Sequence, residues 1–136
     1  MTAITTSDVV AVAEFRAALR VFLRRTERIA RQSGLTPQRY LLLLMVKGAP
    51  DGSERSTVTE LSEQLQLAQS TVTELVSRAE ETGLLEREQS ATDARVAHLR
   101  LTEEGERRLM QAFTGLATER SNLREAFANL DAVLPD

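Results

Sequence analysis

The chain contains 136 residues, of which 42% are hydrophobic and 27% charged, and its formal net charge at pH 7 is −3. These values fit one soluble globular domain, residues 1–136, with enough apolar residues for a core. The chain has no cysteine, which excludes a disulfide framework, a thiolate metal site and cysteine-based redox sensing.

Enzymatic function is disfavoured as well, because the chain has a single histidine and neither a glycine-rich phosphate loop nor a Gly-x-Ser-x-Gly turn. We expect no metal and no cofactor, and His98 is better explained as an exposed residue or a phosphate contact. No apolar run approaches the roughly 20 residues that a bilayer-spanning helix needs, and the first residues lack a signal-peptide pattern. The sequence therefore predicts a cytoplasmic protein without a membrane segment.

The first predicted helix begins at Asp8 and is closed by Gly34. One side carries an a/d-like stripe made of Val12, Phe15, Leu19, Phe22, Thr26 and Ile29. The opposite side carries a row of arginines, namely Arg16, Arg20, Arg24, Arg28 and Arg31, with Arg25 beside them. Such a row is most often a solvated face, and the alternative is an anion pocket between this helix and the segments that follow.

The second predicted helix is capped by Thr36 and has Pro37 in its first turn, where a missing N–H does no harm. Residues 40–46 are apolar all round, which is typical of a central core helix. Residues 48–53 contain glycine, proline, aspartate and serine and are predicted to form a surface loop.

Two short helices follow. Thr57 and Glu60 have the spacing of a capping box, and this helix runs out near residues 66–67. The next helix starts around residues 68–69 and has one buried stripe, formed by Val72, Leu75, Val76 and Ala79. At 100° per residue the opposite face is polar: Ser70, Glu74 and Ser77 point directly away from the stripe, and it is flanked by Thr73 on one side and by Thr71 and Arg78 on the other. A small polar face of this kind suits a groove.

A β-hairpin is predicted after Gly83, which ends the preceding helix. Residues 84–88 form its first strand, and residues 97–101 alternate apolar and polar side chains as its second. The polar residues between them form a tip that carries Asp93, Ala94 and Arg95.

Thr102 caps the last predicted helix, which we expect to be long and to be kinked or interrupted near residues 121–122. Its apolar stripe comprises Leu109, Phe113, Leu116, Leu123, Phe127, Leu130 and Leu134, and Arg120 is the one seam position that is not apolar. A single helix cannot bury such a stripe alone, and the first helix has a matching one. We therefore predict a dimer interface formed by Val12, Phe15, Leu19, Phe22, Leu116, Leu123, Phe127, Leu130 and Leu134.

The order and spacing of these segments resemble the MarR family of winged helix-turn-helix transcription regulators. The residues that carry the resemblance are 58–65, 70–78, 83–87, Asp93-Ala94-Arg95 and 99–105, and Thr36-Pro37-Gln38 fits the second helix of that family. The fold class implied is mainly α with a small β-wing. Residues 57–102 would be the DNA-binding winged helix-turn-helix, and residues 8–48 and 102–134 would be the helical dimerisation and core region.

The resemblance implies a homodimer on double-stranded DNA, with a recognition helix from each subunit in adjacent major grooves and a wing arginine in each minor groove. It also implies a repressor on a pseudo-palindromic operator that is released by a small effector, anionic or aromatic in relatives. The expected DNA contacts are Gln69, Ser70, Thr71, Thr73, Glu74, Ser77, Arg78, Asp93 and Arg95.

Two departures from the family pattern stand out. Ala68 occupies a position where relatives commonly have a capping Ser or Thr, so Gln69, Ser70 or a DNA phosphate must satisfy the free amides. Glu74 replaces an Arg or Lys that is common in relatives. It could accept a hydrogen bond from cytosine, or simply pair with Arg78 four residues on.

Charge supports a competing function. Residues 57–102 contain four arginines and eight acids, a net charge of −4, whereas residues 1–55 contain nine basic and five acidic residues, a net charge of +4. DNA affinity depends on phosphate neutralisation, so additional cations such as Arg39 or Arg55 would help. The alternative is a winged-helix dimer that acts as a protein-interaction or ligand-sensing module with weak or no DNA binding.

Overall fold

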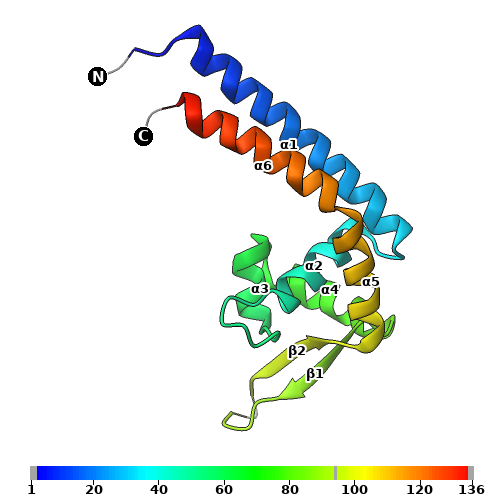
Figure 1. Ribbon diagram of the computed structural model, residues 1–136. Helices are drawn as coiled ribbons and strands as arrows, with labels where there is room; N and C mark the ends of the chain where they lie inside the picture. The colour runs from blue at the N-terminus through cyan, green and yellow to red at the C-terminus, as the bar shows by residue number, and fades with distance from the viewer. Residues whose placement is uncertain (1–2, 94, 135–136) are drawn as a thin grey trace.

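The computed structural model describes residues 3–93 and 95–134, so Ala94 of the predicted wing tip lies outside the described residues. Its elements are α1 (Thr6–Gln32), α2 (Pro37–Lys47), α3 (Val58–Leu65), α4 (Gln69–Glu81), β1 (Leu85–Gln89), β2 (Ala97–Leu101), α5 (Glu103–Gly115) and α6 (Ala117–Val133). Figure 1 shows α1 and α6 side by side, and we call this pair the helical arm. The arm projects from a module formed by α2, α3, α4 and the hairpin, and the predicted fold class is confirmed.

Helix α1 begins two residues before the predicted start at Asp8, because Asp8 takes part in a capping box instead of opening the helix. The Asp8 amide donates to Thr5 Oγ1 at 3.2 Å, and the Asp8 carboxylate accepts from the Thr5 amide at 2.9 Å. Two amides that a helix start leaves open are thereby satisfied.

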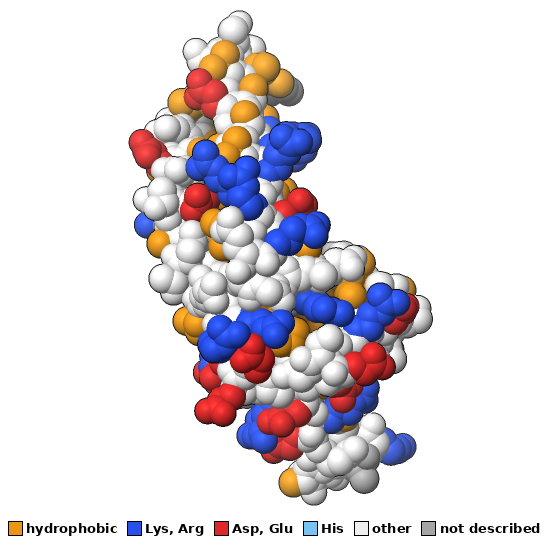
Figure 2. All heavy atoms as spheres, turned by 90° about the vertical axis from the view of Figure 1, so that its right-hand side faces the viewer, with side chains coloured by type: hydrophobic (Ala, Val, Ile, Leu, Met, Phe, Trp, Pro, Cys, Tyr) orange, Lys and Arg blue, Asp and Glu red, His pale blue; other side chains and the backbone are white. Residues whose placement is uncertain are grey.

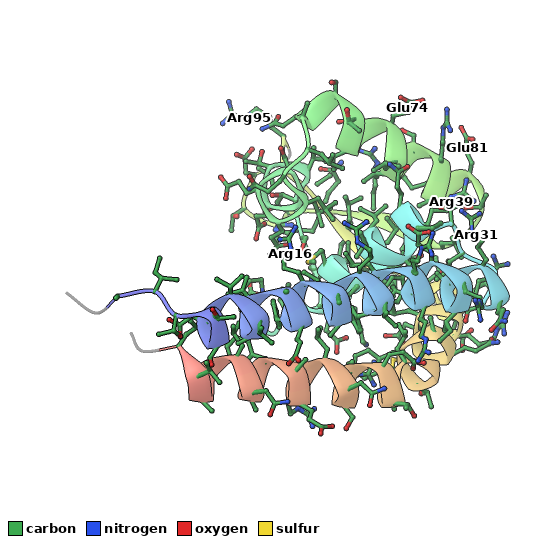
Figure 3. All side chains as sticks on the ribbon, turned by 90° about the horizontal axis from the view of Figure 1, so that it is seen from above. Arg16, Arg31, Arg39, Glu74, Glu81 and Arg95 are labelled. Atoms are coloured by element: carbon green, nitrogen blue, oxygen red, sulfur yellow. The ribbon has the colours of Figure 1, made fainter. Side chains whose placement is uncertain are left out.

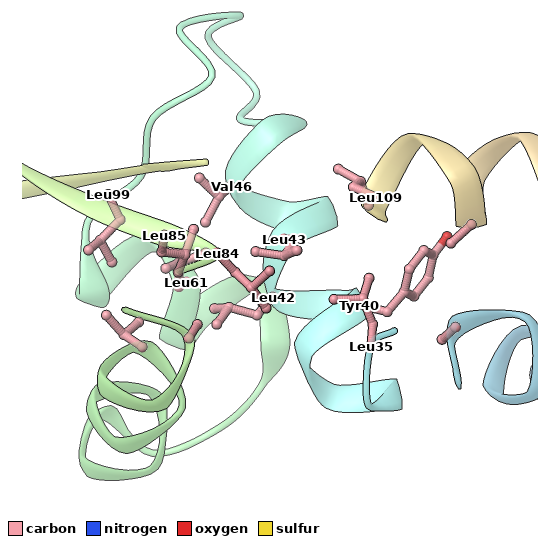
Figure 4. Close-up of a cluster of buried hydrophobic side chains, with 14 of the residues drawn as sticks. Leu35, Tyr40, Leu42, Leu43, Val46, Leu61, Leu84, Leu85, Leu99 and Leu109 are labelled. Atoms are coloured by element: carbon pink, nitrogen blue, oxygen red, sulfur yellow. The ribbon is translucent and has the colours of Figure 1, made fainter. Parts of the chain in front are cut away.

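Helix α2 is the centre of the core, as predicted. Leu42, Leu43 and Val46 are fully buried, and Figure 4 shows them between the side chains of the module and those of α5. Leu61, Val72, Val76, Leu84 and Leu99 complete the module side of this core, and Leu35, Tyr40 and Leu109 extend it towards the arm. Each fully buried leucine contributes about 1.5–3 kcal/mol, so this cluster fixes where α3, α4 and the hairpin lie.

The helix-turn-helix and the hairpin follow the sequence prediction closely. The capping box of Thr57 and Glu60 is present, and α3 ends at Gln66 in the left-handed conformation. Gly83 has a φ of 76°, which glycine adopts without strain. In the hairpin Leu85 pairs with Leu101 and Gln89 with Ala97, while Ser56 adds a short bridge to Leu99.

The region after the wing forms two helices whose junction is Leu116, so the predicted interruption near residues 121–122 is wrong. Leu116 is 1% exposed because its side chain belongs to the core of this same chain. The break allows Leu116 to be buried while α6 turns to follow α1. Arg120 stabilises the junction: its Nη1 donates to the Phe113 carbonyl at 2.6 Å, and its guanidinium lies 4.0 Å from the centre of the Phe113 ring.

The apolar stripes of α1 and α6 pack against each other within one chain. The rings of Phe15 and Phe127 meet edge to face, with centroids 6.1 Å apart. This contact does not cover the arm completely, because Val9, Val12 and Phe127 remain 58%, 43% and 56% exposed. Among the described residues no helix is both long enough and apolar enough to cross a membrane.

A close backbone approach joins α5 to the module. The Thr102 amide donates to the Leu84 carbonyl at 3.0 Å, and the Thr102 hydroxyl donates to the Gly83 carbonyl at 2.6 Å. One turn later, a Cβ added at Gly105 would lie 2.2 Å from the Leu84 carbonyl oxygen. Only glycine permits this approach, which sets the position of the arm relative to the wing.

We predict that Gly105→Ala lowers the free energy of unfolding by about 1–3 kcal/mol, because the new methyl group must push backbone away from backbone. Urea denaturation measures the change. Gly115→Ala is the matched control, since its Cβ would meet only the Ile29 side chain at 3.1 Å and alanine favours a helix. Equal stability of the two variants would contradict the assignment of Gly105 as the joint.

Candidate functional site

The outer face of α4 is available to a partner. Val72, Val76 and Ala79 are buried on the inner face. Of the residues predicted to contact DNA, Gln69, Ser70, Thr71, Thr73, Glu74 and Arg78 are exposed on this helix, and Ser77 is half-buried. The periodicity of the sequence therefore placed these side chains on the correct side of the helix.

The N-terminus of α4 has open amides. Ala68 occupies the cap position in extended conformation, with φ −62° and ψ 147°, and within the described part of the chain no side chain caps the helix. Gln69, which we expected as a substitute cap, instead donates from its side-chain amide to Thr59 Oγ1 on α3 at 3.4 Å. The first amides of α4, together with the positive end of the helix dipole, can thus receive an anion.

Glu74 and Arg78 form an ion pair one turn apart on the outer face. Arg78 Nη2 lies 2.7 Å from Glu74 Oε1, and the two side chains are 62% and 64% exposed. The structure therefore contains the pairing that the sequence suggested. Pairs as exposed as this one contribute only about 0–1 kcal/mol, so a partner can rearrange it at small cost.

The wing tip presents one cation to solvent. The Arg95 side chain is 91% exposed and touches Asp93 Oδ1 through Nε at 3.3 Å. Asp93 also accepts from the Arg95 backbone amide at 3.0 Å, which shapes the turn. These two hydrogen bonds, first the one from the backbone amide, lower the pKa of Asp93. Asp93 is thus a carboxylate that orients Arg95 at neutral pH.

Every arginine between residues 57 and 102 has an acidic partner within this region. Besides the two pairs above, Arg87 contacts Glu80 at 2.9 Å and Arg100 contacts Glu86 at 2.8 Å. Of the four arginines, Arg95 has the longest distance to its carboxylate and the most exposed side chain. It is therefore the arginine that can exchange its carboxylate for an external anion most easily.

The exposed face of α4 and the wing tip lie on one side of the molecule. In Figure 3, Glu74 and Arg95 are both on the side of the module away from the arm. A polar helix of this width fits the major groove of B-DNA, and a cation at the tip of a two-stranded ribbon can reach the narrower minor groove. The arrangement is therefore suited to double-stranded DNA.

The structure shows a charged hollow of about 320 Å³ between α2, α5 and the base of the wing that sequence reasoning missed. Arg55, which lines this hollow and which we named as a cation that could help DNA binding, pairs with Glu88 at 3.0 Å. Lys47 pairs with Glu54 at 2.9 Å and with Glu106, and the hydrogen bond to Glu106 is the larger cause of its raised pKa. The sequence pattern could not reveal these ion pairs, because the paired residues come from separate segments of the chain.

A second hollow, of about 280 Å³, lies on α1 and is lined by Arg16, Arg20 and Arg24 with Leu19, Leu23 and Glu27. None of these three arginines has an ion-pair partner among residues 3–93 and 95–134. Figure 2 shows Lys and Arg side chains gathered on the arm, and basic and acidic side chains mixed over the module below.

The residues predicted for a dimer interface divide into two groups. Val12 and Phe127 are exposed, and Phe15, Leu19, Phe22, Leu123, Leu130 and Leu134 are partly exposed on the arm. Leu116 is buried in the core and is not available to a second subunit, so its assignment to the interface is wrong. Its spacing could not reveal this, because the seam and the core share one stripe.

The model of the MarR family matches residues 33–96, which include the helix-turn-helix and most of the wing. Among curated proteins, an uncharacterized HTH-type transcriptional regulator, YsmB of Bacillus subtilis, is 29% identical over 122 residues, covering 87% of this chain and 81% of that protein.

Two solved structures extend this comparison. A MarR family protein from Bacillus stearothermophilus is 28% identical, with a TM-score of 0.72 over 92% of this chain and 85% of that one. A MarR family transcriptional regulator from Streptomyces coelicolor, solved in complex with DNA, is 22% identical, with a TM-score of 0.64 over 95% of this chain and 78% of that one. At this level of identity, the similarity to the protein from Streptomyces coelicolor shows a shared fold.

We predict that Ala68→Ser raises the free energy of unfolding by about 1 kcal/mol, because a serine hydroxyl at this extended position can accept from an open amide of α4. Thermal or urea denaturation checks the change. Ala68→Val, which adds side-chain volume without an acceptor, should give no comparable gain. A serine variant no more stable than the valine variant would show that these amides are not open.

Proposed function

The chain belongs to the MarR family of winged helix-turn-helix transcriptional regulators, and we propose that it binds a pseudo-palindromic operator as a homodimer and represses transcription. The observation that carries this proposal is the placement of an exposed polar α4 and an exposed Arg95 on one side of the module. In the proposed complex α4 enters the major groove and Arg95 enters the adjacent minor groove.

The contacts divide by their role. The open amides at the start of α4 and the hydroxyls of Ser70 and Thr71 hold phosphates, which fixes the position of the helix on the duplex. Thr73 and Glu74 face base edges in the second turn. Arg95 reads the width of the minor groove, since a narrow groove concentrates negative potential. The protein from Streptomyces coelicolor that shares this fold was solved in complex with DNA, which supports DNA as the partner proposed here.

The acidic balance of residues 57–102 is compatible with DNA binding, because the exposed Arg95 can exchange its carboxylate partner for the anionic groove of the DNA. A surface carboxylate holds its arginine by about 0–1 kcal/mol, whereas a phosphate contact also releases counterions from the DNA. Because an existing ion pair must first be broken, the affinity for DNA of any sequence is lowered. Binding of this chain should therefore depend more on well-placed contacts than on net charge.

We further propose that the helical arm holds the second subunit. At its outer end a hollow of about 430 Å³ is lined almost entirely by apolar side chains, among them Ile4, Val9, Val12 and Leu134. Apolar surface of this extent on a projecting pair of helices calls for a partner. A second copy would also place two recognition helices for half-sites about 10 base pairs apart.

The arginine-lined hollow on α1 is the proposed effector site. Arg16, Arg20 and Arg24 supply guanidinium groups that have no ion pair within the described part of the chain, and Leu19 and Leu23 supply apolar contact, a combination that suits an anionic or aromatic small molecule. Repression and release by such a ligand are proposed on the resemblance to the MarR family. The competing function, an interaction or sensing module with weak DNA binding, draws on the pairing of all four arginines in residues 57–102.

We predict that Arg95→Ala weakens binding to duplexes selected from a random library about tenfold. The slope of log K against the logarithm of the salt concentration should become shallower by about one, because the variant lacks one cation that neutralises DNA phosphates. Fluorescence anisotropy across a salt series measures both quantities. Arg107→Ala on α5 removes the same charge outside α4 and the wing and should bind like the wild type. If the wild-type chain enriches no sequence at low salt, the interaction-module function replaces this one.

We predict that the 15.1-kDa chain sediments as a dimer and that Val12→Asp sediments as a monomer with unchanged helix content, because the exposed arm cannot bury a carboxylate against a second copy. Analytical ultracentrifugation with circular dichroism makes the comparison, and Val12→Ile is the conservative control. A wild-type chain that stays monomeric at micromolar concentration would contradict the dimer.

A further inference from the structure

We propose that Glu74 selects a cytosine in the operator by accepting a hydrogen bond from cytosine N4 in the major groove, with Arg78 as the positioning residue. The inference rests on the proposed function and adds the base that the recognition helix requires. It concerns a side chain that an operator-binding surface would not be expected to carry, since DNA repels a carboxylate.

Glu74 is placed for contact with a base. It lies in the second turn of α4, two residues from the buried Val72 and two from the buried Val76, so the periodicity of the helix directs it outward. Its side chain is 64% exposed, and Figure 3 shows it on the side of α4 away from the arm. A helix that enters the major groove with this face presents Glu74 to base edges.

The ion pair with Arg78 leaves both partners able to bind further groups. Only one atom of each side chain takes part, Glu74 Oε1 and Arg78 Nη2, at 2.7 Å. Within the described residues, neither Glu74 Oε2 nor Arg78 Nε has a hydrogen-bond partner. The arginine therefore fixes the direction of the carboxylate and offsets its charge, while Oε2 remains an open acceptor.

The chemistry of the base edges selects cytosine. An ionised carboxylate only accepts hydrogen bonds, and guanine and thymine present acceptors in the major groove that would repel it. Adenine N6–H lies between two acceptors, its own N7 and O4 of the paired thymine, whereas cytosine N4–H has an acceptor on one side only, O6 of the paired guanine. Cytosine is thus the base that donates to Oε2 with the fewest acceptors against the carboxylate, because the C5 side of N4–H carries none.

A purely structural role for the Glu74–Arg78 ion pair explains less well why a carboxylate lies on this face of α4. Two side chains this exposed stabilise a helix only slightly, and a glutamate with no base to read would weaken every complex that α4 forms. If the carboxylate contacts a base, it has a role in specificity: it disfavours bases that present acceptors, and cytosine offsets that penalty by donating a hydrogen bond. Selection of this kind relies on rejecting competitors.

The test selects bound duplexes from a random library with the wild type, Glu74→Ala and Glu74→Gln, and with Glu81→Ala as the control. Glu81 is an exposed glutamate at the C-terminal end of the same helix, so its loss alters charge without altering the second turn. We expect the wild type and Glu81→Ala to select the same cytosine, Glu74→Ala to lose that preference, and Glu74→Gln to shift it towards adenine, because glutamine matches adenine N6 and N7.

Chemical substitution of the selected base gives a second readout. N4-methylcytosine replaces the hydrogen that points into the major groove, and 5-methylcytosine keeps it. We expect N4-methylation to weaken wild-type binding about tenfold and to leave Glu74→Ala unaffected. Arg78→Ala should keep the cytosine but with a smaller preference, and Arg78→Lys should restore part of it.

The outcomes separate this inference from the proposed function. If the wild type selects an operator and Glu74→Ala selects the same bases at every position, Glu74 does not read DNA and the inference fails alone. If the wild type selects no sequence, the proposed function fails and the inference with it. A loss of preference that Glu81→Ala reproduces would assign the effect to charge and would also overturn it.

Discussion

The burial of α2 is the constraint on which the rest of the structure depends. Leu42, Leu43 and Val46 are fully buried, and α3, α4, β2 and α5 all pack against this one helix. Because each element contributes apolar side chains to the same cluster, none can shift without opening a cavity. The polar face of α4 and the wing can therefore be held rigidly by residues that never touch a partner.

The second constraint is the joint between α5 and the module, where Thr102 bonds to the turn at residues 83–84 and Gly105 lies against the Leu84 carbonyl. The arm is attached to the rest of the chain through this joint and through the turn at residues 33–36. Arg108 strengthens the second attachment by donating to the Gly34 carbonyl at 2.8 Å. In the proposed dimer these two connections, together with the packing of α1 against α2 and α5, join the arm to the module that carries α4.

The distribution of charge over the molecule is not the one that would give the highest affinity for DNA. Among residues 3–93 and 95–134, arginines without an ion pair include Arg16, Arg20 and Arg24 on the arm and Arg39 on α2, whereas the arginines of residues 57–102 are held by carboxylates of the same region. Such a surface has little attraction for DNA of arbitrary sequence, since nonspecific binding comes from uncompensated cations. Discrimination then depends on whether a particular sequence satisfies groups such as Glu74 and Arg95.

The sequence by itself determined the order and type of the elements as far as the second strand of the wing, the capping box at Thr57 and the outer face of α4. These follow from local periodicity and from cap and turn residues, which act over a few positions. Only the tertiary structure decided that Leu116 belongs to the core and that Arg55 is paired with Glu88. Both outcomes depend on residues distant in the chain: a leucine stripe looks the same whether it faces a core or a second subunit, and an arginine shows its partner only after folding brings the two together.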